Sequence, residues 1–277
     1  MTFYQNYDII ITENKEKGKE TMKVFAMSDI HSYYDAMMSA LDRQGFDITN
    51  PDHHVVFCGD LFDRGPDAVK CFNFARELAE QNRLTYIYGN HEELLLDCLN
   101  EILTTKRASR HHVTNGTVDT ISQFSGIPVC DLLLGLYDRE KLIDAMLPVI
   151  NFIADNTYDC AEFFDKFIFT HGWIPCDKLW KVPDNWREPE ADWRSARWIN
   201  GMDAWRHGAR VPERIIVCGH WHASWGHSHI HQDLPEYPDK RQEGWLRSFL
   251  PFVDDGIIAL DACTAYTGFV NCWVFEE

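Results

Sequence analysis

The sequence predicts an α/β fold, and two observations lead to this prediction. Short apolar runs rich in Val, Ile, Phe and Tyr recur along the chain, and each ends in polar residues. Such runs are typical of strands that are buried on both faces. Segments with a helical spacing of apolar residues follow the first three runs. The expected strands are 23–27, 54–58, 84–88, 167–169, 214–218 and 256–260.

The helical segments carry their apolar residues on one side. The patterns at 34–41 and 69–78 predict a helix after each of the first two strands. The stretch 92–103 has Leu and Ile along one side, and 131–154 contains two further striped segments. We therefore expect a helical cap over about residues 92–165.

The composition is ordinary for a globular protein, with 45% apolar and 25% charged residues among 277. The chain has 26 basic and 43 acidic residues, and its net charge of −17 repels nucleic acid and anionic membranes, so neither is expected as a partner. No apolar run approaches the roughly 18 residues of a membrane span, and no secretory signal is found. The nine cysteines include no CxxC pair and are expected to be reduced, which favours a cytoplasmic protein.

Residues 1–22 are predicted to form an N-terminal extension to a single domain at 23–277. The stretch 12–20 is mostly Lys, Glu, Asn and Gly and shows neither a helical nor a strand pattern. An ordered arm, a flexible tail and a natural start at Met22 are the alternatives for this extension.

Six tryptophans fall within a polar insert at about 173–210. We expect these large rings to pack inside a segment with little regular structure, since buried Trp is common. The alternative is a surface on which a substrate base or an aromatic residue stacks. The six are Trp173, Trp180, Trp186, Trp193, Trp198 and Trp205.

Residue types that bind metals follow several of the expected strands. The ligand site of an open α/β sheet lies at the carboxyl ends of its strands, so these residues are expected to converge. Carboxylate, imidazole and amide groups together suit Mn, Fe or Zn. Two such ions, about 3.5–4 Å apart, need a bridging carboxylate and make a cationic pocket suited to phosphate. The segments are 28–31, 59–65, 89–92, 170–172 and 219–222.

Two of these segments resemble the motifs of a known family. GDLFDRG at 59–65 and GNHE at 89–92 are similar to motifs of the calcineurin-like metallophosphoesterases. Within that family they most resemble the branch of the serine/threonine protein phosphatases, the bacteriophage-type protein phosphatases and the symmetrical diadenosine tetraphosphatases. The resemblance covers about residues 23–277 and implies a four-layer α/β/β/α sandwich of two mixed sheets under a helical cap.

The resemblance also implies which side chains bind two divalent transition-metal ions, with Mn expected and Fe or Zn as alternatives. Asp60 would bridge the two ions. His222 matches a ligand of the first ion in the wider superfamily, and a hydrogen-bonding role beside the site is the alternative. The other implied ligands are Asp29 and His31 for the first ion, and Asn90, His171 and His220 for the second.

The resemblance implies a catalytic set as well, with a metal-bridging hydroxide as the nucleophile of an in-line attack. His91 would protonate the leaving oxygen, and Asp63 would orient its imidazole. Arg64 would hold the phosphate oxygens through its planar fork. A second arginine on the phosphate is expected downstream of 170–172, and Arg197 is preferred over Arg194.

Another histidine-rich segment follows the last of these motifs. His227, His229 and His231 alternate, so that a strand would place all three on one face and could bind a metal. No carboxylate is interleaved with them, and we therefore expect an exposed loop.

These patterns predict an enzyme, a metal-dependent phosphoesterase that hydrolyses phosphomonoesters in the manner of a serine/threonine protein phosphatase. Its substrate would be a phosphorylated protein or a small phosphoester. The alternative is a symmetrical dinucleoside polyphosphate hydrolase, which has the same metal core. A phosphodiesterase and a catalytically dead binding module are less favoured. The cap and the Trp-rich insert are expected to decide the substrate, and the oligomeric state is left open.

Overall fold

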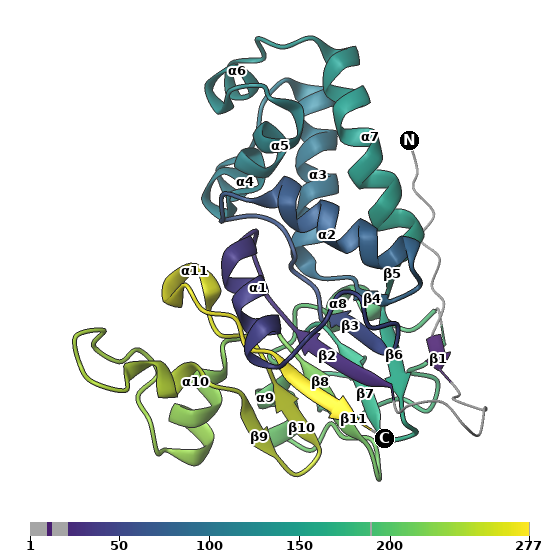
Figure 1. Cartoon of the computed structure of the whole chain (residues 1–277), viewed down its shortest axis with the longest axis vertical. Helices are drawn as coiled ribbons and strands as arrows, with labels where there is room; N and C mark the ends of the chain where they lie inside the picture. Colours follow the sequence, from purple (N-terminus) through teal and green to yellow (C-terminus); the bar gives the residue numbers. More distant parts are fainter. Residues whose placement is uncertain (1–9, 13–21, 189, 277) are drawn as a thin grey trace.

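Two mixed β-sheets form the centre of the computed structural model, which describes residues 10–12, 22–188 and 190–276 (Figure 1). The first sheet has the strand order β11-β2-β3-β4-β5. Strands β2 to β5 run parallel, and β11 is antiparallel to β2 at the edge. The bounds are β2 (Lys23–Met27), β3 (His53–Phe57), β4 (Leu84–Ile87), β5 (Thr157–Tyr158) and β11 (Trp273–Glu276).

The second sheet has the strand order β1-β6-β7-β8-β10-β9. It is also mixed, because β6 pairs antiparallel with β7 and β9 pairs antiparallel with β10. The two sheets together contain all six predicted strands, as β2, β3, β4, β7, β8 and β10. The bounds are β1 (Ile10–Thr12), β6 (Cys160–Phe163), β7 (Phe167–Thr170), β8 (Ile215–Cys218), β9 (Phe252–Asp254) and β10 (Ile257–Ala259).

The apolar runs of the sequence arise because both faces of the central strands are buried. In β2, Val24 and Ala26 pack between the two sheets, whereas Phe25 and Met27 face the helices on the other side. Val217 of β8 meets the first pair from the opposite sheet. Successive side chains of a strand point to opposite faces, so a strand covered on both sides is apolar at every position.

Helices cover the outer face of the first sheet and extend from it as a cap. The helices α3 to α7 gather at one end of the molecule, over the stretch where the cap is predicted (Figure 1). The bounds are α1 (Tyr34–Arg43), α2 (Ala68–Glu80), α3 (Asn90–Thr105), α4 (Arg110–Asn115), α5 (Thr117–Ser125), α6 (Val129–Leu134) and α7 (Arg139–Asn156).

The Trp-rich insert forms the fourth layer, on the outer face of the second sheet. It is mostly irregular and contains the short helices α8 (Trp193–Ala196) and α9 (Gly201–Arg206). The ring of Trp198 is not packed inside the insert, because 43% of the surface of this residue is exposed. The prediction that the rings pack is confirmed for Trp173, Trp186, Trp193 and Trp205, which are buried in one cluster.

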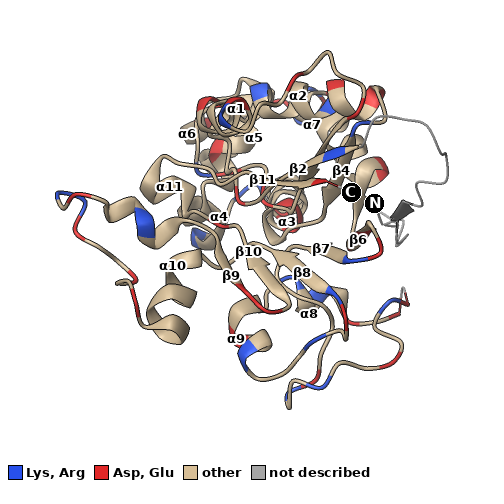
Figure 2. Ribbon diagram, turned by 60° about the horizontal axis from the view of Figure 1, so that its bottom comes forward, with Lys and Arg blue, Asp and Glu red and all other residues tan. Residues whose placement is uncertain are grey.

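The remaining segments lie after β8. Helix α10 (Ala223–Gly226) continues into a π-helical turn (His227–His231), where the sequence predicted an exposed loop. Phe249 ends a 3₁₀ turn that begins at Trp245, and α11 (Thr264–Thr267) precedes β11. Basic and acidic residues are mixed over the outer helices and loops (Figure 2). No helix in the described part of the chain has the length and apolarity needed to cross a membrane.

Of the predicted extension 1–22, the structure describes only 10–12 and 22. Residues 10–12 form β1, which pairs in parallel with β6 at the edge of the second sheet. The rest of the extension lies outside the described residues, and the division into an extension and a single domain stays a prediction.

Candidate metal and phosphate site

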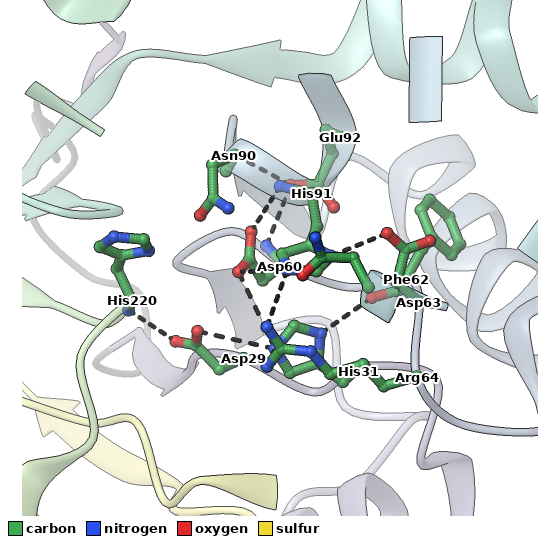
Figure 3. Close-up of polar contacts among 12 residues, drawn as sticks. Asp29, His31, Asp60, Phe62, Asp63, Arg64, Asn90, His91, Glu92 and His220 are labelled. Atoms are coloured by element: carbon green, nitrogen blue, oxygen red, sulfur yellow. Dashed lines mark hydrogen bonds and ion pairs between the residues drawn. The ribbon is translucent and has the colours of Figure 1, made fainter. Parts of the chain in front are cut away.

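The predicted ligands other than His222 converge where five strands end, at what we call the candidate site (Figure 3). Strands β2, β3, β4, β7 and β8 are followed by Asp29, Asp60, Asn90, His171 and His220. Several of these residues leave their strands with left-handed backbone, at φ of 53° for Asp29, 55° for Asp60 and 66° for His220. Such backbone costs about 1–3 kcal/mol per residue and is concentrated at functional sites.

Two motif glycines make room for this convergence. Gly59 has a φ of +83°, and a Cβ on it would clash with the imidazole of His171. A Cβ on Gly89 would clash with the carboxylate of Asp60. Any larger residue at either position would push the ligand side chains apart.

The carboxylate of Asp60 lies between two groups of ligand atoms. Its Oδ1 accepts a hydrogen bond from the backbone N–H of His91 at 2.9 Å and lies 3.3 Å from Nε2 of His171. Its Oδ2 lies 3.9 Å from Nε2 of His31 and 4.0 Å from Nε2 of His91. The atoms within each group lie within 4.8 Å of one another, and the groups are His31, Asp60, His91 and Asp60, His171, His220.

Three imidazoles in these groups are oriented by their other nitrogen. The Nδ1–H of His31 donates to the carbonyl oxygen of Phe62 at 3.0 Å. The Nδ1–H of His171 donates to the carbonyl oxygen of Cys58 at 2.7 Å. The Nδ1–H of His91 donates to Oδ2 of Asp63 at 2.7 Å. In a neutral ring the lone pair is then on Nε2, and it faces Asp60. This is how metal-binding histidines are held in place.

The group around His171 has the character of a cation site. Its Nε2 lies 2.8 Å from Oδ1 of Asn90 and 3.3 Å from Oδ1 of Asp60. All three atoms carry lone pairs, so a cation between them would relieve their mutual repulsion. Burial, and then the charges of Asp29 and Glu92, raise the pKa of Asp60 well above its usual range. A divalent ion would reverse that shift.

Arg64 places a positive charge against the group of His31, Asp60 and His91. Its Nη1 lies 2.7 Å from Nε2 of His31, and its Nη2 lies 3.0 Å from Nε2 of His91. The guanidinium thus donates to the Nε2 lone pair of His31, which a metal would use, and to that of His91. Nitrogen and oxygen donors without a thiolate suit a divalent transition metal, so the residues fit two ions that share Asp60.

Glu92 connects these loops, although no role was predicted for it. Its Oε2 accepts from the backbone N–H groups of Asp60 and Gly89, at 2.9 Å each. Its Oε1 accepts from the N–H of Leu61 at 2.9 Å and from the hydroxyl of Tyr86 at 2.6 Å. The carboxylate is fully buried and fixes the loop after β3 to the start of α3. Its place in the GNHE segment is the signal that could have found it.

Asp63 is held by the cap as well as by His91. Its carboxylate accepts from the hydroxyls of Thr117 at 2.8 Å and Thr120 at 2.7 Å, both on α5. Burial raises the pKa of Asp63 to about 7, and the two threonine bonds oppose that rise. The threonines are more than fifty positions away in the chain, and no sequence pattern pointed to them.

His222 lies outside both ligand groups. Its Nδ1 is 2.7 Å from Oγ of Ser224, and its Nε2 is 3.1 Å from the hydroxyl of Tyr237 and 3.7 Å from Oε1 of Glu236. His220, by contrast, donates its backbone N–H to Oδ2 of Asp29 at 2.8 Å. The metal-binding role of His222 stays a prediction.

The two candidate arginines are engaged with carboxylates. Buried Arg197 donates from Nη2 to Asp159 at 3.0 Å and from Nη1 to Glu93 at 3.5 Å, and its guanidinium lies 4.4 Å from the ring centre of Tyr88. Arg194 is largely exposed, and its Nε lies 2.6 Å from Oε1 of Glu93. Among the described residues, neither arginine lines the cavity, and the phosphate role of Arg197 stays a prediction.

A cavity opens over the candidate site. Trp198 contributes an exposed ring, which meets the ring of His220 edge-on at 5.8 Å between centroids and 85° between planes. Helix α4 of the cap contributes His111 and Asn115. The sequence assigned none of these three to the site. The other lining residues are Asp29, Asp60, Arg64, Asn90, His91, Leu94 and His220.

Comparison with known proteins decides the family. The model of the calcineurin-like phosphoesterases matches residues 22–236. The chain belongs to this family. Its members use divalent metal ions, and the predicted resemblance is confirmed, together with the fold of two mixed sheets and helices.

Several relatives are named as hydrolases of dinucleotides. A symmetrical bis(5'-nucleosyl)-tetraphosphatase of Aeromonas hydrophila is 33% identical over 283 residues, covering 87% of this chain and 97% of its own. An asymmetrical bis(5'-nucleosyl)-tetraphosphatase of Bacillus subtilis is 38% identical over 132 residues, and the match covers 43% of this chain and 51% of the relative. For two other asymmetrical relatives, of Bacillus velezensis and Oceanobacillus iheyensis, the match spans 28% and 30% of their length.

A solved structure supports the fold. It is described as a candidate diadenosine tetraphosphatase, with a TM-score of 0.52 and 16% identity, and the match covers 98% of this chain and 94% of that one. At this identity the likeness concerns the fold alone. These comparisons place the chain in the branch that holds both the serine/threonine phosphatases and the dinucleoside tetraphosphatases.

Proposed function

We propose that this member of the family hydrolyses dinucleoside polyphosphates in a metal-dependent reaction. The observation that carries the proposal is the exposed ring of Trp198 on the cavity beside His220. A nucleobase stacks on such a ring, at about 1–3 kcal/mol per base. The symmetrical relative of Aeromonas, matched over 97% of its length, supports the same substrate class. A serine/threonine protein phosphatase, favoured by the sequence alone, becomes the alternative.

The two ion positions are assigned to the groups that share Asp60, with His91 left free to act as an acid and Mn as the expected metal. Asp29 and His31 complete the first position, and Asn90, His171 and His220 complete the second. When bound, the ions supply positive charge for the phosphate oxygens and activate water at neutral pH. This assignment rests on the convergent lone pairs of His31, His171 and Asp60.

The side chains of the chain perform the remaining steps. Arg64, whose guanidinium already lies beside His31 and His91, binds two phosphate oxygens through its fork. His91 donates a proton from Nε2 to the leaving oxygen, while Asp63 keeps the ring oriented through Nδ1. Burial, and then the charge of Arg64, lower the pKa of His91, and the negative charge of a bound phosphate acts in the opposite direction.

The reaction consumes one water for each bond cleaved. The water oxygen joins one phosphorus of the chain of phosphates, and the bond from that phosphorus to a bridging oxygen breaks. A proton passes to the leaving phosphate oxygen. Cleavage at the central bridge of a tetraphosphate yields two nucleoside diphosphates, whereas cleavage off the centre yields a monophosphate and a triphosphate.

The test compares two substrates with the Mn-loaded protein. Diadenosine tetraphosphate is offered beside a phosphothreonine peptide, and the nucleotide products are separated by ion-exchange chromatography. We expect a higher kcat/KM for the dinucleotide. ADP alone would identify symmetrical cleavage, and AMP with ATP asymmetrical cleavage. A higher kcat/KM for the peptide would contradict the proposal and support the protein phosphatase.

A substitution tests the stacking surface. Trp198→Ala should raise the KM for diadenosine tetraphosphate by about 5- to 150-fold, as expected for one lost base stack. The KM for p-nitrophenyl phosphate should rise much less. Trp221→Ala is the matched control, because Trp221 is similarly exposed, at 38%, and does not line the cavity. Equal effects of the two substitutions would contradict a stacking role for Trp198.

A further inference from the structure

A second cluster of histidine and carboxylate side chains lies on the segment after β8. One ligand-type atom from each of His227, His231 and Asp233 lies within 4.8 Å of the other two. None of the three belongs to the ligand groups of the candidate site. Helix α10, which leads into the cluster, packs against β9, away from the cap helices α6 and α7 (Figure 1).

The local backbone brings the three side chains together. The π-helical turn places the rings of His227 and His231 with their centroids 6.0 Å apart. Gln232 then adopts left-handed backbone with a φ of 57°, and the N–H of Asp233 donates to the carbonyl of His227 at 3.3 Å. The chain thus folds back and returns a carboxylate to the histidines, which their alternation in the sequence did not indicate.

Hydrogen bonds leave a lone pair on each ring. Nε2–H of His227 donates to the carbonyl of Leu250 at 3.2 Å, and Nε2–H of His231 donates to Oδ2 of Asp254 at 2.9 Å. Within the part of the chain that the structure describes, the buried Nδ1 of His227 has no hydrogen-bond partner. It lies 3.6 Å from Oδ1 of Asp233. A ring held through one nitrogen, with the other facing a carboxylate, is the arrangement of a metal-binding histidine.

We propose that His227, His231 and Asp233 bind one further divalent ion of the zinc class. Two imidazole nitrogens and one carboxylate oxygen form the protein donor set of an open zinc site, whose fourth position is taken by water. Calcium and magnesium prefer oxygen ligands alone and do not suit it. Because Leu250 and Asp254 hold the two rings, the ion would tie the turn after α10 to the edge strand β9.

The test counts zinc in the full-length protein. The protein is stripped with a chelator, reloaded with Zn²⁺, freed of excess metal and analysed for zinc per chain by mass spectrometry. The double variant His227→Gln, His231→Gln should hold one zinc fewer per chain than the wild type. An unchanged zinc content would overturn the proposal.

His229→Gln is the matched control within the same turn. The ring of His229 stacks on Trp225 and its Nε2 lies 3.7 Å from Glu236, so this variant should keep the zinc content of the wild type. Loss of one zinc in this variant too would overturn the assignment to His227 and His231.

A single substitution separates metal binding from folding. Asp233→Asn removes an exposed carboxylate, so the melting temperature without metal should be unchanged. Its zinc affinity at this site should fall by at least about 10-fold, measured by titration calorimetry. Wild-type affinity in this variant would contradict the proposal even if the double variant fails to fold. Hydrolysis by the Mn-loaded enzyme should be unaffected, which keeps this test independent of the proposed function.

Discussion

At the scale of single residues, the candidate site depends on how each polar group is held by a second one. His91 points Nε2 into the cavity because Asp63 holds its Nδ1. The backbone N–H of His91 in turn holds Oδ1 of Asp60. The side chains that we propose as general acid, metal bridge and phosphate-binding arginine are therefore fixed by one connected network (Figure 3).

The general-acid role of His91 predicts a dependence on the leaving group. His91→Asn should slow hydrolysis of a phosphoserine peptide by about 10²–10⁴-fold, because an alkoxide needs a proton to leave. It should slow p-nitrophenyl phosphate much less, since nitrophenolate leaves without one. The measurement is kcat for both substrates at saturating Mn²⁺, and an equal loss on both would count against the role.

The site residues that the sequence predicted are those in compact motifs at strand ends, such as Asp60 and His91. The sequence could not predict Thr120 or His111, because the cap brings them to the site from more than ten positions away and their neighbours in the chain show no pattern. Trp198 was indistinguishable from the buried tryptophans around it, because composition does not show which ring faces the cavity.

At the scale of elements, helix α5 of the cap binds Asp63, the partner of the proposed general acid, through two hydroxyls. Asp63 must be ionised to hold the Nδ1–H of His91, so activity should fall as the pH drops through the pKa of Asp63, about 7. Thr120→Val removes a hydrogen bond that lowers this pKa, and the acidic limb of the pH profile of kcat should move to higher pH.

Thr114→Val is the control for this shift. Thr114 is exposed on the neighbouring helix α4, and its hydroxyl bonds only backbone carbonyls, of Arg110 and His111. The acidic limb of the pH profile of Thr114→Val should coincide with that of the wild type. A profile of Thr120→Val that overlays the wild type would show that α5 does not tune Asp63.

Strand β3 carries a histidine that makes stability depend on pH. His54 faces the second sheet, with its ring 5.6 Å from that of Phe163 and its Nε2 2.9 Å from Oγ1 of Thr85. Burial, and then the charge of Arg83, lower the pKa of His54 to about 4. The unfolded chain takes up this proton near pH 6.5, so stability is lost as the pH falls from about 6.5 to 4.

His54→Gln keeps a polar partner for Thr85 and removes the titration. Between pH 7.5 and pH 5 the free energy of unfolding should therefore fall by about 1–2 kcal/mol less in the variant than in the wild type. Urea unfolding of the metal-loaded proteins at both pH values measures this difference. Equal losses would show that the pKa of His54 is the same in the folded and the unfolded chain.

Secondary structure followed from the sequence where burial was strongest. The parallel strands β2 and β8 are apolar at nearly every position because both faces are covered. Short edge strands such as β5 and β9 carry too few residues to show a pattern. The helical spacing of apolar residues placed Val69 on the apolar face of α2, but this residue is 38% exposed.

At the scale of the whole molecule, two stacked sheets bring ligands from distant parts of the chain to one edge. Asp60 follows a strand of the first sheet, and His171 and His220 follow strands of the second. The stacking of the sheets therefore sets the distance between the two ligand groups. The buried carboxylates of Asp29, Asp60 and Glu92 leave this edge in need of positive charge, which bound ions would supply.

The central claim is that Asp60 is shared by two metal ions. Electron paramagnetic resonance of the Mn-loaded protein tests it directly, because two Mn²⁺ ions joined by one carboxylate are spin-coupled and isolated ions are not. The wild type should show a coupled pair, and Asp60→Asn should lose both the coupling and hydrolysis. Isolated Mn²⁺ signals alone in the wild type, or a coupled pair that survives Asp60→Asn, would contradict the account.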